Sequence, residues 1–349
     1  MTFNQLESAD DTNDHQEGGP VPFDGLTPDV ILSALEAHGF EPDGRLLALN
    51  SYENRVFQVG LDSGEFIVTK FYRPERWSDE AIQEELEFLE ELASDELPVV
   101  TALPNKSGER LHHFGGFRFA SFPRRGGYAP ELNDPDDVER MGRLMARVHL
   151  IGAQKSYVHR PKIDMESFGI EPRNAILTLG LMGNETLKNY EAISSEALIA
   201  IQQAYDQAGP IQSLRLHGDA YPGNVLWSID GPLLVDFDDS RMGPAVQDLW
   251  MLLNGNRREQ QLDLDLLLEG YEIFRSFNGR ELHLVEALRT LRLIHYAAWI
   301  SRRWNDPAFP KAFPWFGTTA YWEERCRELE EQINAMHSHH HQGQNILPP

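Results

Sequence analysis

The sequence predicts an α+β protein with two unlike halves, a β-rich first lobe and a mainly helical second lobe. Short runs of apolar and β-branched residues, separated by glycine-containing turns, fill residues 45–122. From residue 136 onward, apolar residues recur at helical spacing instead, apart from one strand-like segment at 214–240. The length of 349 residues fits two such lobes, because one domain commonly has roughly 100–200 residues.

The first lobe is expected at residues 23–122 and should contain five strands and a helix. The strands are the runs 45–50, 55–59, 65–72, 111–114 and 117–122. The helix begins after Ser78, which is a good N-cap, and Asp79 and Glu80 suit the positive end of the helix dipole. Apolar residues then keep helical spacing as far as Ala93.

The second lobe is expected at residues 128–336. Residues 123–127, with the sequence Pro-Arg-Arg-Gly-Gly, break the strand pattern before it. Helices are predicted at 136–150, 185–207, 244–254, 260–276, 280–304 and 318–336. No internal repeat divides this half further, so it is expected to form one helical unit.

Both ends of the chain are expected to lack a fixed structure. Residues 1–22 are polar, acidic and rich in glycine and proline, which is typical of a disordered arm. Residues 337–349 are interpreted as a flexible tail. The histidines at 337–341 offer metal ligands, but a frayed tail is the favoured interpretation, because nothing beside them would fix a coordination geometry.

Composition limits the partners and the location. Asp and Glu number 55 against 31 Lys and Arg, so the net charge of −24 excludes a general basic surface for nucleic acid. The excess fits a solvated acidic surface, with an acidic cleft for a cationic substrate as the alternative. The N-terminus resembles no signal peptide, and no apolar stretch is long enough to span a membrane. Cys326, the single cysteine, is interpreted as an unreactive helical thiol, and a cytoplasmic location is expected.

The strand-like segment carries the residues that point to chemistry. His217-Gly218-Asp219 and Asn224 share one loop, and Asp236 ends the next apolar run, which the Gly231-Pro232 turn folds back toward Asn224. Phosphoryl transfer needs an acceptor hydroxyl held in line, Mg²⁺ across the phosphates and a cationic clamp. Asp, Asn and Asp at this spacing can supply a proton acceptor and oxygen ligands. The alternative is a polar loop whose side chains cap turns.

A cationic clamp is available in the first lobe. Lys70 ends an apolar strand, from which it can reach phosphates as a point charge. On the following helix Glu85 falls on the same arc as the apolar residues, and a carboxylate there is costly unless it is paired. We therefore predict a Lys70–Glu85 ion pair, with Glu84 as the second choice and two independent surface charges as the alternative.

Three further acidic residues leave two interpretations open. Asp238 and Asp239 follow the proposed metal ligand and either extend the acidic site or, as we favour, cap the next turn. Asp248 lies in Gln-Asp-Leu-Trp and either braces the catalytic loop by hydrogen bonds or is an exposed helix residue.

These motifs together resemble a known superfamily. The chain is similar to the aminoglycoside-phosphotransferase and choline-kinase-like branch of protein-kinase-like proteins, and within it to the bacterial stress response kinase A family, also called RdoA or YihE. The resemblance covers about residues 25 to 325. The matching stretches are 51–57, 70–77, 217–224, 239–254 and 302–310.

The resemblance implies a two-lobed protein-kinase-like fold with a hinge at 123–127 and ATP between the lobes. It implies Asp219 as the catalytic base, Asn224 and Asp236 as Mg²⁺ ligands, with Asp236 also catalytic, and Lys70 with Glu85 as the phosphate clamp. It places Ser51 in the phosphate loop, and Ser121 and Phe122 at the ATP-binding hinge. It also implies a Ser/Thr protein kinase of the stress response that phosphorylates itself and a protein substrate. Separately from the resemblance, a monomer is expected.

Two departures from the eukaryotic kinase pattern qualify this expectation. Residues 51–57 contain no glycine, so backbone amides and the Ser51 hydroxyl would have to hold the phosphates. The motif is His-Gly-Asp, so the basic residue that reads a phosphorylated activation loop is absent. A small-molecule kinase acting on an amine or sugar metabolite is the first alternative function. The second is an inactive nucleotide-binding interaction protein, which intact Lys70, Asp219, Asn224 and Asp236 argue against.

Overall fold

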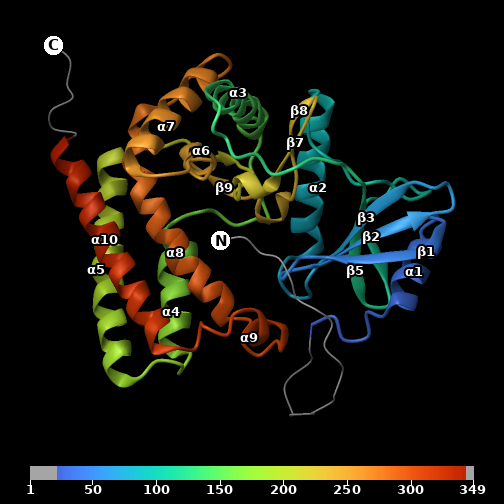
Figure 1. Ribbon diagram of the computed structural model, residues 1–349, viewed down its shortest axis with the longest axis horizontal. Coiled ribbons are helices and arrows are strands. Elements are labelled where there is room, and N and C mark those ends of the chain that lie inside the picture. The colour runs from blue at the N-terminus through green and yellow to red at the C-terminus, as the bar shows by residue number, and fades with distance from the viewer. Residues whose placement is uncertain (1–21, 343–349) are drawn as a thin grey trace.

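The structure is a computed structural model that describes residues 22–342 and has two lobes joined at one side (Figure 1). The β-rich N-lobe and the helical C-lobe confirm the predicted fold class. The expected N-terminal arm lies outside the described residues, apart from residue 22. The tail expected from residue 337 was placed too early, because the last helix continues to Gln342. Residues 343–349 lie outside the described part.

The N-lobe is built on one antiparallel sheet. Its strand order is β1-β2-β3-β5-β4. All five predicted strands are present within a few residues of their expected bounds, as β1 (Pro42–Leu49), β2 (Arg55–Leu61), β3 (Phe66–Phe71), β4 (His112–Phe114) and β5 (Phe117–Pro123). A helix that the prediction missed, α1 (Pro28–Ala37), packs on this sheet through Ile31, Ala34 and Leu35. Its start signals were present in the sequence, since Thr27 caps it and Pro28 opens it.

Helix α2 (Asp79–Ser94) lies between the two lobes (Figure 1). Ser78 caps it as predicted, with its hydroxyl accepting from the Ala81 amide. The first half of α2 packs on the N-lobe, because Ile82 and Leu86 contact Tyr72 and Ala120 in one small core. Its second half belongs to the large C-lobe core through Phe88, Leu89 and Leu92. Both lobes therefore fix the position of this helix.

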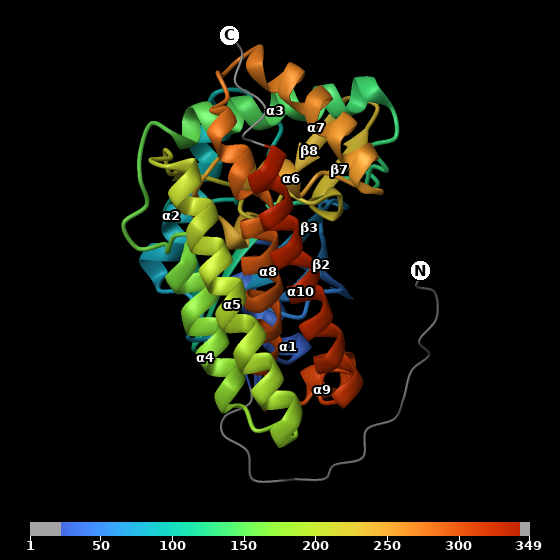
Figure 2. The ribbon, with the colours of Figure 1, turned by 90° about the vertical axis from the view of Figure 1, so that its left-hand side faces the viewer.

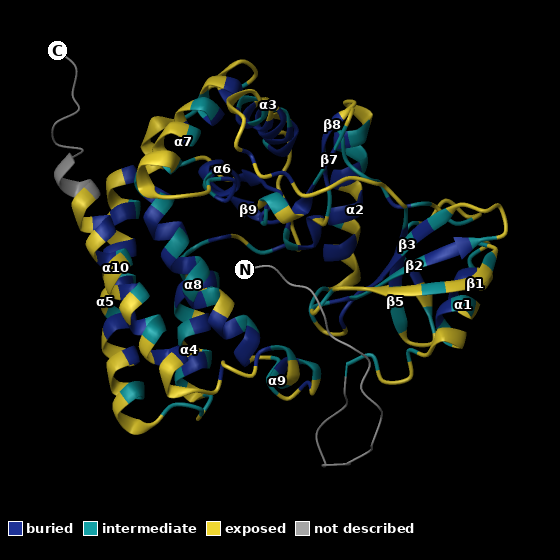
Figure 3. Cartoon of the chain, viewed as in Figure 1, coloured by how far each residue is buried: buried dark blue, intermediate teal, exposed yellow. Residues whose placement is uncertain are grey.

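The C-lobe is a helical bundle with two small hairpin-like strand pairs on its cleft side. Its helices are α3 (Pro135–Gly152), α4 (Glu171–Thr178), α5 (Asn184–Ala208), α6 (Val246–Trp250), α7 (Arg257–Glu272), α8 (Val285–Ser301), α9 (Ala308–Ala312) and α10 (Thr319–Gln342). Figure 2 shows α4, α5, α8 and α10 side by side, and contacts join α5 to α10 and α4 to α8. Figure 3 shows their facing sides buried and their outer sides exposed.

The helix predictions were correct in place but imprecise at their ends. The helix expected at 244–254 is reduced to α6, and the one expected at 280–304 begins as a 3₁₀ turn, Gly279–Leu284, before α8. Helices α4 and α9 were not predicted, because both are short and their apolar spacing is weak. Within residues 22–342, no helix is both long and apolar enough to cross a membrane.

The segment predicted as loop, strand, turn and strand folds as expected. It forms β6 (Leu214–Arg215), β7 (Val225–Ser228), β8 (Gly231–Leu234) and β9 (Met242–Gly243). Strands β7 and β8 pair antiparallel, with Val225 opposite Leu234, and β6 pairs with β9. The turn itself is at 229–230, and Gly231 and Pro232 already belong to β8. The hairpin carries the residues on either side of it back to one place at the cleft.

Candidate active site

A cavity of about 350 Å³ lies between the lobes. Strands of the sheet supply Val56 and Val68 to its wall, and the β7–β8 hairpin supplies Leu226 and Leu234 from the other side. The charged residues that reach it are Lys70, Glu85, Arg125 and Asp236. Apolar walls with a few converging polar groups are typical of a binding site for a small ligand.

The predicted Lys70–Glu85 ion pair is present. Lys70 Nζ lies 3.1 Å from Glu85 Oε1, and both side chains are buried. Arg160 donates to the other oxygen of Glu85 at 2.7 Å. Burial acts to lower the pKa of Lys70, but the carboxylates of Glu85 and Asp238 raise it well above its ordinary value. Glu84 is excluded as the partner, because its carboxylate accepts from the backbone amides of residues 158–160 instead.

Asp236 faces Lys70 from the C-lobe. Its Oδ1 lies 3.4 Å from Lys70 Nζ, although the two residues belong to different lobes. Its backbone is left-handed, with φ 60° and ψ 68°, a conformation that is uncommon for non-glycine residues. The side chain is exposed to the cleft. The geometry therefore leaves the Asp236 carboxylate open to a ligand while Lys70 fixes one of its oxygens.

Asn224 and Asp219 form a second pair beside the cleft. The Asn224 amide nitrogen donates to the Asp219 carbonyl oxygen at 2.9 Å and to Asp219 Oδ2 at 3.1 Å. This orientation turns the amide oxygen of Asn224 away from Asp219. The Val235 amide donates to the Asn224 backbone carbonyl at 3.0 Å, which holds Asn224 next to the chain that leads into Asp236. Burial raises the pKa of Asp219.

The oxygen atoms of Asn224 and Asp236 suit a hard divalent cation. An amide oxygen and a carboxylate are ligands that Mg²⁺ accepts, and Mg²⁺ normally takes the rest of its shell from phosphates and water. Among residues 22–342, no three His, Cys, Asp or Glu side chains gather closely enough to hold a metal ion. The donor set therefore fits Mg²⁺ bound together with a nucleotide rather than an all-protein metal centre.

Asp248 braces the loop that carries Asp219. It is fully buried and accepts from the amides of His217 at 2.8 Å and Gly218 at 2.9 Å. His149 Nε2 lies 3.1 Å from the same carboxylate. Of the two interpretations of Asp248, the brace is confirmed and the exposed helix residue is wrong.

Gly218 has a structural reason to be glycine. Its φ is +85°, and a Cβ atom would lie 2.1 Å from the Asp239 carbonyl oxygen. No side chain fits this position without moving the segment after Asp236. The absence of a basic residue in the motif is therefore imposed by the packing of the catalytic loop against residues 239–240.

Arg292, on α8, contacts the predicted base and was not anticipated. Its Nη2 lies 2.7 Å from Asp219 Oδ1. The guanidinium opposes the effect of burial on the pKa of Asp219. Nothing local in the sequence marks this arginine, because it lies in an amphipathic helix far along the chain from Asp219.

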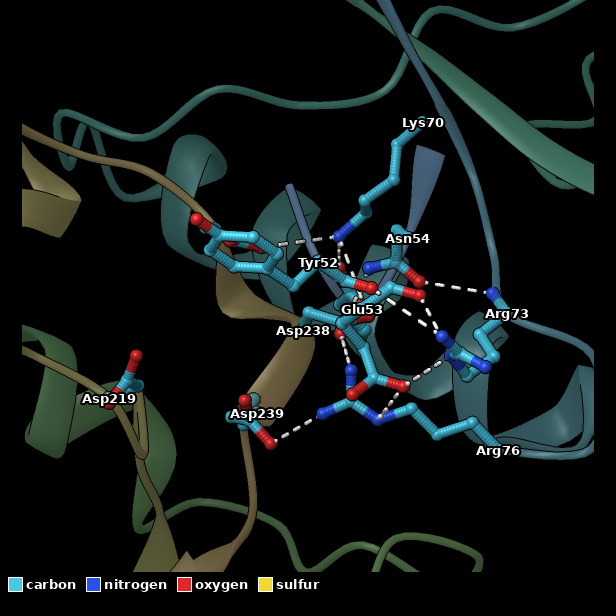
Figure 4. Close-up of polar contacts among 12 residues, drawn as sticks. Tyr52, Glu53, Asn54, Lys70, Arg73, Arg76, Asp219, Asp238 and Asp239 are labelled. Atoms are coloured by element: carbon cyan, nitrogen blue, oxygen red, sulfur yellow. Dashed lines mark hydrogen bonds and ion pairs between the residues drawn. The ribbon is translucent and has the colours of Figure 1, made fainter. Parts of the chain in front are cut away.

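Asp238 and Asp239 belong to a network of ion pairs rather than to a turn cap. Arg76 contacts both carboxylates, Asp238 at close range and Asp239 at 2.7 Å, as Figure 4 shows. Asp238 also lies 3.6 Å from Lys70 Nζ. The favoured interpretation, that these residues cap a turn, is wrong. The alternative, that they extend the acidic site, describes Asp238 better, because Asp238 joins the carboxylates around Lys70. Its pKa stays low despite burial because Arg76 and Lys70 face it.

Residues 50–54, which precede β2 and which we call the phosphate loop for its predicted role, are tied to both lobes by this network (Figure 4). Asn54 donates to Asp238 at 3.1 Å and accepts from the Arg73 amide at 3.0 Å. Arg73 in turn pairs with Asp306 of the C-lobe at 2.7 Å.

Glu53 makes the most direct contact between the phosphate loop and the C-lobe. Its carboxylate accepts from Arg303 Nη2 at 2.7 Å and from the indole nitrogen of Trp299 at close range. Arg73 Nε lies 3.2 Å away. The loop therefore rests on α8 and the turn after it. The sequence stretches that resemble the family, 51–57 and 302–310, are the two sides of this contact.

The N-lobe residues that were predicted to contact the nucleotide do not all reach the cavity. Ser51 and Phe122 line the cavity. Ser121 does not reach it, because its side chain is buried on the opposite side of β5 and hydrogen-bonds to Thr69 at 3.0 Å. Its carbonyl accepts from the Leu103 amide at 2.7 Å.

Cys326 is buried in α10, and burial raises its pKa to about 11, in keeping with an unreactive thiol.

Comparison with known proteins shows which family the chain matches. The phosphotransferase enzyme family matches residues 45–285. Stress response kinase A of Escherichia coli (strain K12) is 42% identical over 314 residues, which cover 90% of this chain and 94% of that protein. Serine/threonine protein kinase RdoA of Salmonella typhimurium (strain LT2) is 41% identical over 315 residues, or 90% and 95% of the two chains.

Solved structures show the same fold at low identity. Amicoumacin kinase hAmiN, in complex with AMP-PNP, Ca²⁺ and Ami, superposes with a TM-score of 0.69 at 15% identity over 87% of this chain and 93% of that one. The microcompartment-associated aminopropanol kinase superposes with a TM-score of 0.66 at 20% identity over 88% and 98%. At such identities the likeness extends to the fold alone.

Proposed function

Since the chain belongs to the phosphotransferase enzyme family and, within it, to the stress response kinase A family, it is a kinase, and we propose that it is a Ser/Thr protein kinase that uses ATP and Mg²⁺. In this proposal it transfers the γ-phosphate to a protein substrate and to itself, as a monomer in the cytoplasm of a bacterium under stress. The single observation that carries the proposal is the meeting of Lys70, Glu85 and Asp236 at one cavity between the lobes.

The nucleotide side of the reaction follows from the cavity. Adenine would enter between the apolar walls near Phe122, and its phosphates would extend toward Ser51 and Lys70. The Lys70 ammonium, held by Glu85, supplies positive charge to the phosphates. Asn224 and Asp236 would hold Mg²⁺, which when bound neutralises charge on the β- and γ-phosphates.

The acceptor side centres on Asp219. A carboxylate that is held by Asn224 and by the braced catalytic loop is positioned to orient an acceptor hydroxyl and to take its proton. As the hydroxyl oxygen bonds to the γ-phosphorus, the bond from phosphorus to the bridging oxygen of ADP breaks. The proton passes to Asp219. Positioning of this kind contributes more to phosphoryl transfer than covalent chemistry by the protein does.

A small-molecule kinase for amine metabolites is the second candidate function. The net charge of −24 favours it, because an acidic protein attracts cations. Arg292 argues against it, because its guanidinium contacts Asp219 where the acceptor must lie and would repel an ammonium group there. An inactive nucleotide-binding protein is disfavoured, because Lys70, Asp219 and Asp236 are all present in a connected arrangement.

The test combines labelled ATP with three variants. Purified protein is incubated with γ-labelled ATP and Mg²⁺, and label is scored on the protein itself, on a panel of proteins and on a panel of amines and sugars. Asp236→Ala should lose transfer. Asp219→Asn should bind Mg·ATP nearly as wild type but transfer roughly 10²–10⁴-fold more slowly. Lys70→Ala should weaken both ATP binding and the rate.

Each outcome of this test has a distinct meaning. Label on amines or sugars alone would establish the second candidate. Loss of ATP binding in folded Asp219→Asn would make Asp219 a nucleotide or metal ligand rather than the base. Undiminished transfer by Asp236→Ala would remove Asp236 from the mechanism.

A further inference from the structure

Exposed aromatic side chains gather around Tyr296, which lies one helical turn after Arg292, the partner of the predicted base. Tyr296 on α8 is 39% exposed, Tyr52 of the phosphate loop is 53% exposed, and Trp315 after α9 is 41% exposed. Large aromatic residues are more often buried, so three of them in one exposed group mark a surface that binds something.

These side chains are connected by ring contacts. Tyr296 stacks on Trp299 with ring centres 5.7 Å apart, and Trp299 contacts Phe313 at 5.8 Å. Phe313 contacts Tyr52 at 5.1 Å and Trp315 at 5.7 Å. We call these five residues the aromatic strip. Because Tyr52 comes from the N-lobe and the others from the C-lobe, the strip exists only while the lobes are in contact.

The end of the strip nearest Asp219 is positively charged. Arg292 lies one helical turn before Tyr296 on α8, so the two side chains share one face of that helix. It is 40% exposed, and its ion pair with Asp219 uses one nitrogen. A guanidinium has five N–H donors, so Arg292 keeps donors for a second carboxylate.

We propose that the aromatic strip and Arg292 form the binding surface for a protein segment whose Ser or Thr is flanked by an acidic residue and by an apolar residue. The proposal rests on the Ser/Thr kinase function above and names the acceptor that the kinase selects. A carboxylate of the segment contacts Arg292 when the hydroxyl lies at Asp219, and an apolar side chain lies against Tyr296 and Tyr52.

The helix geometry sets the spacing in the segment. Arg292 and Tyr296 are separated by about 6 Å along α8, because each residue of a helix rises about 1.5 Å. An extended peptide advances about 3.3 Å per residue, so the acidic and the apolar positions should differ by roughly two residues. The acidic residue belongs next to the acceptor, and the apolar residue belongs two or three positions away from it.

Charge distinguishes this occupant from the alternatives. The protein is acidic overall, yet Arg292 keeps spare N–H donors one helical turn from Tyr296. Glu53, the carboxylate that contacts Trp299 of the strip, is itself held by Arg303. The spare donors of Arg292 favour an acidic residue in the partner segment and disfavour a basic one. The strip also lies on the acceptor side of Asp219 rather than in the ATP cavity, which it does not line.

The experiment compares synthetic peptides as acceptors for the full-length protein with Mg·ATP. Six peptides carry Ser flanked by Asp, Asn or Lys, and each of these three types is made with Leu and with Ala at the apolar position. The variants are Arg292→Gln and Tyr296→Ala. Arg143→Gln and Phe274→Ala serve as controls, because both residues are exposed and lie outside the strip. Self-phosphorylation is measured in parallel on every variant.

Wild type should prefer the Asp peptide over the Asn peptide by roughly five- to tenfold in kcat/KM, since a partly exposed charge pair is worth modest energy. Arg292→Gln should bring this ratio close to one. An effect of Arg292 on Asp219 alone would slow both peptides equally and leave the ratio unchanged. Tyr296→Ala should raise KM for Leu peptides and leave Ala peptides unaffected. The controls should behave as wild type.

Three results would overturn the inference. They are a preference for the Lys peptide, an unchanged Asp-to-Asn ratio in Arg292→Gln, and self-phosphorylation without labelling of any peptide. In each case the protein still labels a protein acceptor, so the proposed function stands. If wild type labels neither itself nor any peptide but does label an amine, the proposed function fails.

Discussion

Glu53 offers the sharpest test of how the glycine-free phosphate loop is held. Its side chain is 12% exposed, accepts from Arg303 and Trp299, and forms an ion pair with Arg73, whose Nε donates to the Glu53 backbone carbonyl. Glu53→Gln keeps the size of the side chain but removes its charge. It also places an amide NH₂ where at least one of those donors points. The change should release the loop from the C-lobe without altering a residue that lines the ATP cavity.

The structure sets the size of the effect. Breaking a buried ion pair by removing one partner costs about 3–5 kcal/mol. The loss here should be lower, about 2 kcal/mol, because Arg73 keeps Asp306 and Arg303 keeps the Trp299 carbonyl. We call the loop seated when it contacts the C-lobe and lifted when it does not. A loss of about 2 kcal/mol changes the equilibrium constant between these two forms roughly 30-fold. If only the seated loop binds ATP, the apparent Kd rises by less, on the order of tenfold, because the seated form dominates at the start.

The assay is calorimetry with Mg·AMP-PNP on wild type, Glu53→Gln, Arg303→Gln and the double variant. Hydrogen exchange of residues 50–54 reports the loop itself. Glu65→Gln, an exposed change in the turn between β2 and β3, is the control. Because the two residues are in contact, the double variant should lose less than the sum of the singles. Unchanged affinity and exchange in Glu53→Gln, or strictly additive losses, would refute the idea that this contact seats the loop.

Three further predictions concern residues away from the cavity. Asp248→Asn should destabilise the protein by about 2–3 kcal/mol and slow transfer, because the buried amides of His217 and Gly218 lose a charged acceptor. Denaturant unfolding measures the loss of stability, and the control Asp265→Asn should change neither stability nor transfer. Burial lowers the pKa of His295 to about 3 from 6.5, so the unfolded chain alone binds that proton as pH falls from 6.5 toward 3. Stability should therefore fall across this window, and less steeply in His295→Phe; equal slopes of Tm against pH would contradict it. Cys326, with its pKa raised to about 11, should resist thiol reagents at pH 8 until the protein unfolds; rapid labelling of native protein would contradict it.

The contacts in the site that the sequence predicted follow from local sequence patterns. Lys70 was placed by an apolar strand and Glu85 by its position on the apolar arc of a helix, and the two side chains meet. Spacing around the Asn224–Asp236 hairpin likewise follows from one turn between two short strands. Local periodicity suffices in these cases, because each partner lies on an element whose buried face is legible in the sequence.

The position of Ser121 on the far side of β5 could also have been predicted from the sequence. Adjacent residues of a strand point to opposite faces of the sheet, so Ser121 and Phe122 cannot both face the cavity. Phe122 lines it, and Ser121 bonds to Thr69 on the far side. The alternation in β5 was sufficient to exclude one of the two residues.

Other features had no local signal to find. Arg292 meets Asp219 only after α8 has packed within the helical lobe, and Glu53 meets Arg303 only after that lobe has closed on the sheet. Each is a charged residue on an element with ordinary polar faces, which sequence reasoning assigns to solvent. Such long-range ion pairs depend on how distant elements are packed, which hydrophobic periodicity does not encode.

The two departures from the eukaryotic kinase pattern have a common physical consequence. The loop without glycine is held by Glu53 against the C-lobe, so its position does not depend on a bound nucleotide alone. The catalytic loop is held by Asp248, and a side chain at Gly218 would collide with the Asp239 carbonyl. Both loops are therefore fixed by contacts inside the folded chain. At the position of Gly218, a phosphorylated activation loop has no basic residue to engage.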